Sequence, residues 1–248
     1  MFILKRLGFS AFTVMCLALA STAPALAGKL TEAVKAGDVV LVRSLLAAGE
    51  DVQEKVKGDY PLNVAALYGP VEMVNVLLEG GADIERPSRD GLRPLHNAVL
   101  SGRKEAVKLL LQKGAVVDSK ENWGRTPLLR FAASAGSDIE IARMLLAAGA
   151  DPGIEDEELD QPLHYAAQIG NIELGKLLIA AHVDVNHAGI DGWSAILAAV
   201  VNSHHEFVKL LITAGADINV TRGPQGNRPL FYARDDAMRK LLIDAGAK

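Results

Sequence analysis

Apolar residues recur along this chain in short ladders with helical spacing. One ladder consists of Val74, Leu77 and Leu78, and a similar one ends at Leu111. Side chains three and four residues apart share a helix face, so each ladder predicts a short helix with one buried side. A glycine ends each ladder, and a polar stretch rich in turn-forming residues, such as 82–93, follows it. Such a stretch favours a projecting, hairpin-like loop.

A second kind of short helix is predicted before each ladder. In the stretch GRTPLLRFAA, the Thr126 hydroxyl can cap a helix that begins at Pro127, where the missing N–H costs nothing. Alanine pairs such as Ala65-Ala66 allow close approach of the neighbouring unit. A glycine such as Gly170 then ends the helix because it tolerates positive φ. Each unit therefore consists of helix, turn, helix and loop.

These units repeat with a nearly constant period. The entry prolines are Pro61, Pro94, Pro127, Pro162 and Pro229, with Ala195 in the place of a sixth. Successive gaps are 33, 33, 35, 33 and 34 residues. Pro-Leu-His tripeptides stand at 94–96 and 162–164, and Gly-Ala pairs close most units. In period and motif the chain resembles the ankyrin-repeat family.

The resemblance covers nearly all of the chain after its first residues. It implies an all-α solenoid of stacked helix-turn-helix units with projecting finger loops, about seven units including caps. Residues 29–53 lack the proline entry, as expected of an N-terminal cap, and the shortened, charged unit from Gly226 suits a C-terminal cap. The resemblance also implies that His96 and His164 are structural and bond the backbone of the adjoining finger.

The first 27 residues have the layout of a secretory signal peptide. Lys5 and Arg6 precede an apolar run from Leu7, and a small-x-small site ends at Ala27. An uncleaved membrane anchor is the alternative, although the apolar run is shorter than a full span of about 20 residues. We expect cleavage after Ala27, one ankyrin-repeat domain over 28–248, and a periplasmic or secreted protein without cysteine.

Charge and motif content narrow the function. Removal of the leader takes Lys5 and Arg6 but no acidic residue, so the formal net charge of −4 becomes −6. Nucleic-acid binding needs clustered Lys and Arg, which this chain lacks. No phosphate-binding glycine loop, nucleophile elbow or His-Glu-x-x-His motif occurs. We expect neither an enzyme nor a cofactor.

One alternative is a metal- or small-ligand-binding protein. His182, Asp184 and His187 lie within six residues, and His205 could add a fourth ligand. The extended stretch that contains them does not by itself make their side chains converge. The spacing is therefore a weak signal for a metal site.

The favoured function is binding of another protein by a monomer, as an accessory factor or inhibitor of an enzyme. Trp123 and Trp193 flank turn glycines, and large aromatic side chains at a rim favour partner contacts. The acidic run of Glu155, Asp156, Glu157 and Glu158 would complement a basic partner. Further candidates on the concave face of the first helices are Tyr68, Asn97, Arg130 and Tyr165. Packing between fingers is the alternative role for the tryptophans, and plain solvation for the charges.

Overall fold

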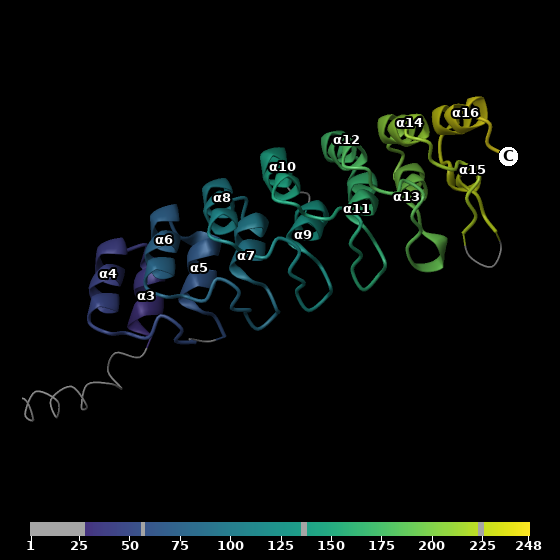
Figure 1. The fold of residues 1–248 in the computed structure, drawn as a ribbon. Coiled ribbons are helices and arrows are strands. Elements are labelled where there is room, and N and C mark those ends of the chain that lie inside the picture. Colours follow the sequence, from purple (N-terminus) through teal and green to yellow (C-terminus); the bar gives the residue numbers. More distant parts are fainter. Residues whose placement is uncertain (1–27, 56–57, 135–137, 223–225) are drawn as a thin grey trace, which may run out of the picture.

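The computed structural model describes residues 28–55, 58–134, 138–222 and 226–248 (Figure 1). The predicted leader, residues 1–27, lies outside the described residues. Within the described ranges there are fourteen α-helices, one 3₁₀ helix (Ile190–Gly192) and two isolated β-bridges. The helices are α3 (Lys29–Ala36), α4 (Val39–Ala47), α5 (Pro61–Tyr68), α6 (Val71–Glu79), α7 (Pro94–Leu100), α8 (Lys104–Gln112), α9 (Pro127–Ala133), α10 (Ile139–Ala147), α11 (Pro162–Ile169), α12 (Ile172–Ala180), α13 (Ala195–Val201), α14 (His205–Thr213), α15 (Pro229–Tyr232) and α16 (Asp236–Asp244).

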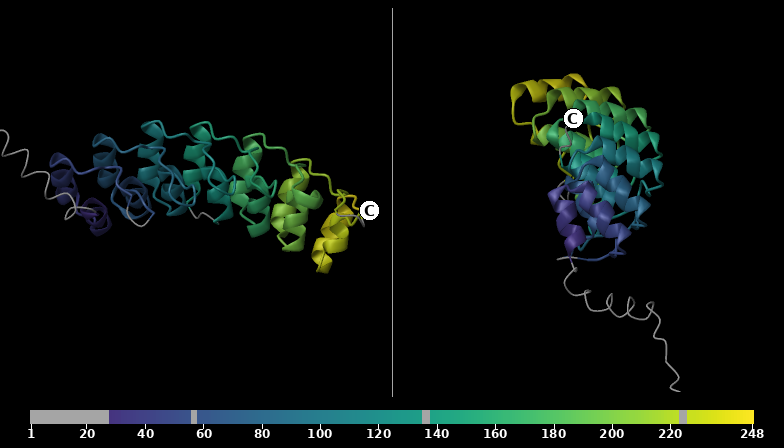
Figure 2. Two further views of the ribbon diagram at one scale, coloured as in Figure 1. Left: turned by 90° about the horizontal axis from the view of Figure 1, so that it is seen from below. Right: turned by 90° about the vertical axis from the view of Figure 1, so that its left-hand side faces the viewer.

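Consecutive helices pair into seven units that stack in one row (Figure 1). The first helices of the units form one layer and the second helices another, and each helix contacts its counterpart in the next unit. The row stays continuous when it is turned by 90°, and the end-on view shows successive units rotated relative to one another (Figure 2). The predicted all-α solenoid of seven units including caps is confirmed.

The helix starts follow from the sequence of each unit. Proline occupies the first position of five first helices. The predicted cap is present in α9, where the Leu129 N–H donates to Thr126 Oγ1 at 3.3 Å. In α7 the residue before the proline is Arg93 instead of threonine. The Arg93 N–H donates to His96 Nδ1 at 3.3 Å. His96 therefore satisfies the N–H of the residue before Pro94, which is a different donor from the one that Thr126 caps in α9.

Stacking buries a recurring leucine in the second helix of each unit, from α6 onward. All six are fully buried, and they recur at the repeat spacing: Leu77, Leu110, Leu145, Leu178, Leu211 and Leu242. Burial of such a side chain contributes roughly 2 kcal/mol, so each unit gains stability from its neighbours. Between first helices the predicted alanines, such as Ala65 and Ala66, are fully buried. Phe131 of α9 stands at the Ala65 position of its unit and is buried as well.

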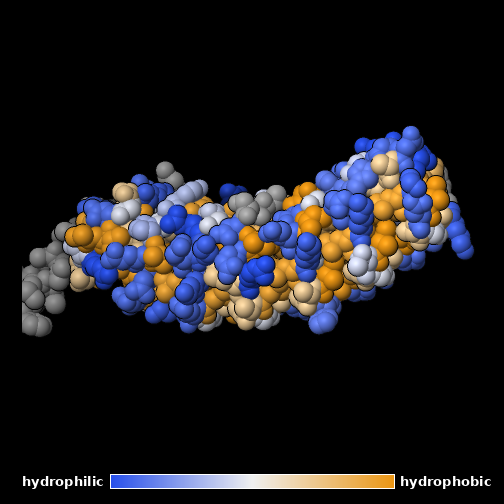
Figure 3. Space-filling model, turned by 90° about the horizontal axis from the view of Figure 1, so that it is seen from above, coloured by the Kyte–Doolittle hydropathy of each residue, from blue (hydrophilic) through white to orange (hydrophobic). Residues whose placement is uncertain are grey.

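The finger loops project from the side of the first helices, away from the second helices (Figure 1). Each described finger closes as a hairpin through a backbone bond, for example from the Gly189 N–H to the Trp193 carbonyl at 2.7 Å. Hydrophilic and hydrophobic residues are interspersed along the face built by the second helices (Figure 3). In the described ranges, no helix is both long and apolar enough to cross a bilayer.

Candidate interaction surface

The fingers are tied to one another at their tips. Three backbone hydrogen bonds of 3.3 Å join successive fingers: Asn122 N–H to the Asp90 carbonyl, Glu157 N–H to the Trp123 carbonyl, and Ile190 N–H to the Glu158 carbonyl. These four fingers are therefore positioned by their neighbours as well as by their own helices. Side chains at the tips are presented on a connected edge, which limits the entropy lost when a partner binds.

Buried histidines fix the bases of these fingers. His164 Nδ1 accepts from the Gln161 N–H at 3.1 Å, so Nε2 carries the proton and donates to the His187 carbonyl at 3.2 Å. His96 donates in the same way to the Arg125 carbonyl at 3.1 Å. Burial lowers the pKa of both imidazoles to about 4. Their expected structural role is confirmed, because each links a first helix to the following finger.

The acidic run contains one buried residue. The side chain of Asp156 is 0 % exposed. It accepts from Arg125 Nε at 3.0 Å and from the Tyr165 hydroxyl at 2.6 Å. The Glu158 and Asp160 N–H groups donate to its other oxygen at 3.0 and 3.1 Å. Our placement of Asp156 on the accessible tip was wrong: this carboxylate organises the turn of the finger.

Tyr165 belongs to the same network. Its hydroxyl also accepts from Arg125 at 2.8 Å, and the guanidinium lies 5.2 Å from the ring centroid. Burial, followed by its hydrogen bond to Asp156, raises the pKa of this phenol. The side chain is half-buried, and its polar end is occupied within the chain. Tyr165 therefore positions the finger of 148–161, which we call the acidic finger.

Trp123 remains available at the neighbouring tip. Half of it is exposed (50 %), and the Arg130 guanidinium lies 5.4 Å from its ring centroid. Arg130 is itself held 3.8 Å from the buried carboxylate of Glu121. A small cavity of about 60 Å³ places Trp123 beside Glu157 and Glu158, both of which are exposed. The structure thus brings these three candidates together.

The remaining candidates are dispersed. Tyr68, at the end of α5, is the most exposed of them (72 %) but lies two units before α9. Asn97 is buried, and its amide donates to the Asn63 carbonyl at 3.4 Å, so its expected accessible position on the concave face was wrong. Glu155 Oε1 lies 3.2 Å from His187 Nε2, so this carboxylate already has a contact within the chain. The acidic run is therefore only partly free to meet a partner.

Trp193 borders a larger cavity of about 490 Å³. Arg222 from the next finger lies over its ring, 4.4 Å from the centroid. Glu158 and Asp160 of the acidic finger line the same cavity, as does Asp191. Burial, Asp156 and Glu158 together raise the pKa of Asp160 to about 6. Sequence reasoning did not single out Asp191 or Arg222, although Asp191 occupies the same place before its entry position as Glu158 does.

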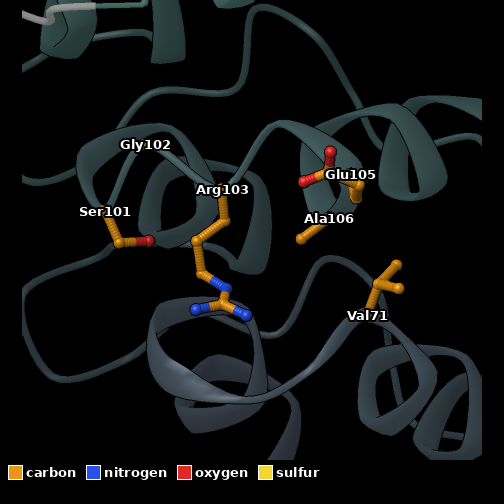
Figure 4. Close-up of a pocket in the computed structure, with 6 residues that line it drawn as sticks. All are labelled: Val71, Ser101, Gly102, Arg103, Glu105 and Ala106. Carbon is orange, nitrogen blue, oxygen red and sulfur yellow. The ribbon is translucent and has the colours of Figure 1, made fainter.

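A different cavity, of about 330 Å³, lies between the α5–α6 and α7–α8 units (Figure 4). Val71 borders it on one side and Ser101 and Glu105 on the other. Arg103 extends across it, and its guanidinium donates to the Gly69 carbonyl at the end of α5. The arginine is thus a tie between adjacent units, and this cavity is a gap in the stacking beside it.

Three of the four side chains of the metal-site alternative are engaged in other contacts. His187 Nε2 lies 3.1 Å from the Leu159 carbonyl, in addition to its contact with Glu155. His205 pairs with Asp235 at 2.9 Å, and Asp184 accepts from the Asn186 N–H. Among the residues that the structure describes, no three His, Cys, Asp or Glu side chains are grouped so that they could hold a metal ion.

One informative position was missed. Glycine stands three residues before most entry positions, as in Gly91 and Gly124, and has positive φ there. In the acidic finger this position is Leu159, with φ 59° and 46 % exposure. An alignment of the finger sequences at their prolines shows this exception without the structure. It marks the acidic finger as the one that has an apolar side chain in place of the turn glycine.

Comparison with known proteins agrees with the repeat architecture. A family model described as ankyrin repeats (3 copies) matches residues 30–121, 86–156, 129–222 and 163–248. The ankyrin repeat protein YahD of Escherichia coli is 28 % identical over 225 residues, which cover 87 % of this chain and 94 % of YahD. The solved ankyrin repeat domain of human ASB11 superposes with a TM-score of 0.77, 26 % identity and coverage of 88 % of this chain and 98 % of that domain.

Other relatives are much longer proteins. Alpha-latrocrustotoxin-Lt1a of the spider Latrodectus tredecimguttatus is 33 % identical over 111 residues, 44 % of this chain. The match spans 8 % of that toxin. The similarity is therefore confined to a repeat segment of it.

Proposed function

Because the chain belongs to the ankyrin-repeat family, we propose that it is a scaffold that binds a partner protein through its finger tips and the concave face of its first helices. Ankyrin repeats are generally protein–protein interaction modules, and the fold is typically a non-catalytic scaffold. The observation that carries the proposal is the rim formed by Trp123, Glu157 and Glu158. An exposed aromatic ring beside carboxylates on fixed backbone suits a well-ordered interface.

The partner that fits this rim has a basic surface. Glu157 and Glu158 are exposed, and in the described part of the chain neither forms an ion pair. Charge complementarity of this kind speeds encounter and selects orientation. The candidate roles are an accessory factor for an enzyme and an inhibitor of one, with the scaffold acting as a monomer.

We place this function in the periplasm or outside the cell. Support comes from the leader pattern of residues 1–27 and from the lack of cysteine after residue 27. Expression of the full chain in a bacterium, followed by N-terminal sequencing of the periplasmic fraction, should give a mature protein that begins at Gly28. Retention of residue 1 in the membrane fraction would instead indicate an anchor.

Partner capture tests the binding surface. Tagged mature protein is exposed to an extract of the source organism, the periplasmic fraction where it has one, and bound proteins are identified by mass spectrometry. Trp123→Ala should reduce recovery of the specific partner roughly tenfold or more, as loss of a central aromatic contact does. The matched charge variants are Glu158→Gln at the rim and Glu173→Gln, an exposed residue of α12 in the layer remote from the fingers. Equal recovery with all three variants would contradict the proposal.

A further inference from the structure

The cavity beside Trp193 lies between successive fingers. Glu158 and Asp160 of the acidic finger border it, and Asp191 and Trp193 come from the following finger. Arg222 closes it from the finger after that. Its volume of about 490 Å³ is large enough for a side chain from another protein. The tip-to-tip bond from Ile190 to Glu158 holds two of its walls in place.

The carboxylates of this cavity lack the partners that other acidic residues of the fingers have. Asp156 is paired with Arg125, and Glu155 is paired with His187. Within the described residues, Glu158, Asp160 and Asp191 form no ion pair at all.

Among these carboxylates, Asp160 has the surroundings least favourable to its negative charge. Its Oδ1 atom is buried and has no hydrogen-bond donor among the described residues. Like charges on Asp156 and Glu158 disfavour its ionised form further. An incoming cation would relieve the charge repulsion, because it brings an opposite charge into a partly desolvated site, whereas Oδ1 itself stays packed against Gly189.

The shape of the cavity favours an organic cation over a metal ion. In the described ranges no three acidic or histidine side chains converge as metal ligands. Trp193 provides an aromatic wall, and Arg222 already shows that a guanidinium stacks on this ring at 4.4 Å. A planar guanidinium also matches carboxylates in a two-point fork, which an ammonium does not.

We propose that the cavity lined by Glu158, Asp160, Asp191 and Trp193 is a subsite that binds an arginine side chain of the partner protein. This inference rests on the proposed scaffold function and specifies one of its contacts. The guanidinium lies between the carboxylates and the indole ring, and its aliphatic stem packs on Ile190. The partner therefore presents an arginine from a segment that runs along the finger tips.

A fluorescence titration tests the subsite directly. The chain has two tryptophans, so Trp123→Phe leaves Trp193 as the sole reporter. The probe is the capped tripeptide acetyl-Gly-Arg-Gly-amide, and the comparison probes are its lysine counterpart, MgCl₂ and CaCl₂. We expect a saturable change in Trp193 emission, with the arginine peptide at least about fivefold tighter than the lysine peptide.

Variants in the same background assign the contact. Asp160→Asn with Asp191→Asn should weaken binding of the arginine peptide roughly tenfold, and asparagine retains the tolerance of Asp191 for its φ of 57°. Glu173→Gln should leave the affinity unchanged. Equal affinity for the lysine peptide, saturation by either metal salt, or undiminished binding in the double variant would overturn the arginine assignment.

The outcome separates this inference from the scaffold proposal. If the partner is captured with Trp123 dependence but the arginine peptide gives no saturable signal, the subsite is wrong and the scaffold function stands. If the peptide binds as expected but no partner is captured, the subsite stands as a guanidinium site and the scaffold function fails.

Discussion

The fingers that lead into α7 and α9 and those that lead into α11 and α13 have the same hairpin-like backbone but bend it with different residues. Gly91 and Gly124 adopt positive φ at the turn of the first two. Leu159 takes the equivalent place in the third, with φ 59°. In the fourth, Asp191 adds a second left-handed residue, with φ 57°, before the turn glycine. A residue that carries a side chain costs roughly 1–2 kcal/mol when its backbone adopts this left-handed conformation.

The difference is regional. Within the described ranges, every non-glycine residue with positive φ falls between 159 and 203: Leu159, His182, Asp191 and Ser203. The same stretch contributes Asp160, Asp191 and Trp193 to the cavity with unpaired carboxylates. The earlier fingers are bent in the least strained way, whereas residues 159–203 retain side chains where glycine would be more stable. Backbone strain of this kind clusters at functional sites, and Asp191 is the left-handed residue that lines the cavity.

Acid should produce the largest change, and it acts on both regions. His96 and His164 have pKa values near 4 in the folded chain and near 6.5 when unfolded. The unfolded chain therefore binds more protons between these values, so their stabilising effect is complete above about pH 6.5 and is lost as the pH falls towards 4. Each histidine should cost up to about 3 kcal/mol of unfolding free energy at the acid end.

Urea unfolding at a series of pH values measures this loss of unfolding free energy. One variant in each region tests which groups cause it. His96→Asn should flatten the profile, because Asn63 at the same position of α5 already donates to the Leu92 carbonyl at 2.9 Å. Asp160 has the opposite sign: its pKa of about 6 in the fold means that stability falls as the pH rises from 3.8 through 6. Asp160→Asn should therefore steepen the acid loss. A pH-independent unfolding free energy would contradict both assignments.

A side chain at the turn of an early finger should have the next largest effect. A Cβ at Gly91 would lie 2.8 Å from the Asn122 backbone nitrogen, which is held by its bond to the Asp90 carbonyl. We expect Gly91→Ala to lower the unfolding free energy by roughly 2–3 kcal/mol, from strain and overlap together. Gly114→Ala, with φ 89° but nothing within 4 Å of the added carbon, is the matched control and should lose only about 1 kcal/mol. Equal losses of unfolding free energy in the two variants would show that the finger tips rearrange at little energetic cost.

The converse substitution should have the smallest effect on stability. Leu159→Gly relieves the left-handed strain, so the unfolding free energy in urea should rise by about 1 kcal/mol. The same variant removes an exposed apolar side chain beside Glu158, so partner capture should become weaker. A stabilised variant that binds less well would sharpen the regional contrast. A destabilised variant would show instead that the Leu159 side chain packs within the fold.

The regular spacing of the repeat motifs made most of the fold predictable. Entry prolines, alanine pairs and closing glycines each act within one unit, so Pro61 or Gly170 can be interpreted from a few neighbours. The helix pairs and the roles of His96 and His164 followed from this local chemistry together with the family resemblance. The leader and the site of its cleavage remain predictions, because residues 1–27 lie outside the described residues.

The candidate site was less predictable because it depends on contacts between units. Asp156 lies 31 residues from Arg125, and only stacking brings them together. A run of acidic residues suggests uniform solvation, so the burial of one carboxylate among exposed ones is not visible in composition. Asn97 was misplaced for a similar reason, since its amide bonds the preceding unit at Asn63. Leu159, which sequence reasoning had not singled out, did carry a sequence signal as the exception at a glycine position.

The hydrogen bonds between finger tips affect how the protein resists degradation. A protease must draw several residues of a loop into an extended conformation in its cleft, and hairpins joined on both sides cannot separate singly. Cleavage at the exposed tip near Trp123 requires release from the Asp90 side and the Glu157 side together. We expect these bonds to slow digestion at the finger tips without any disulfide.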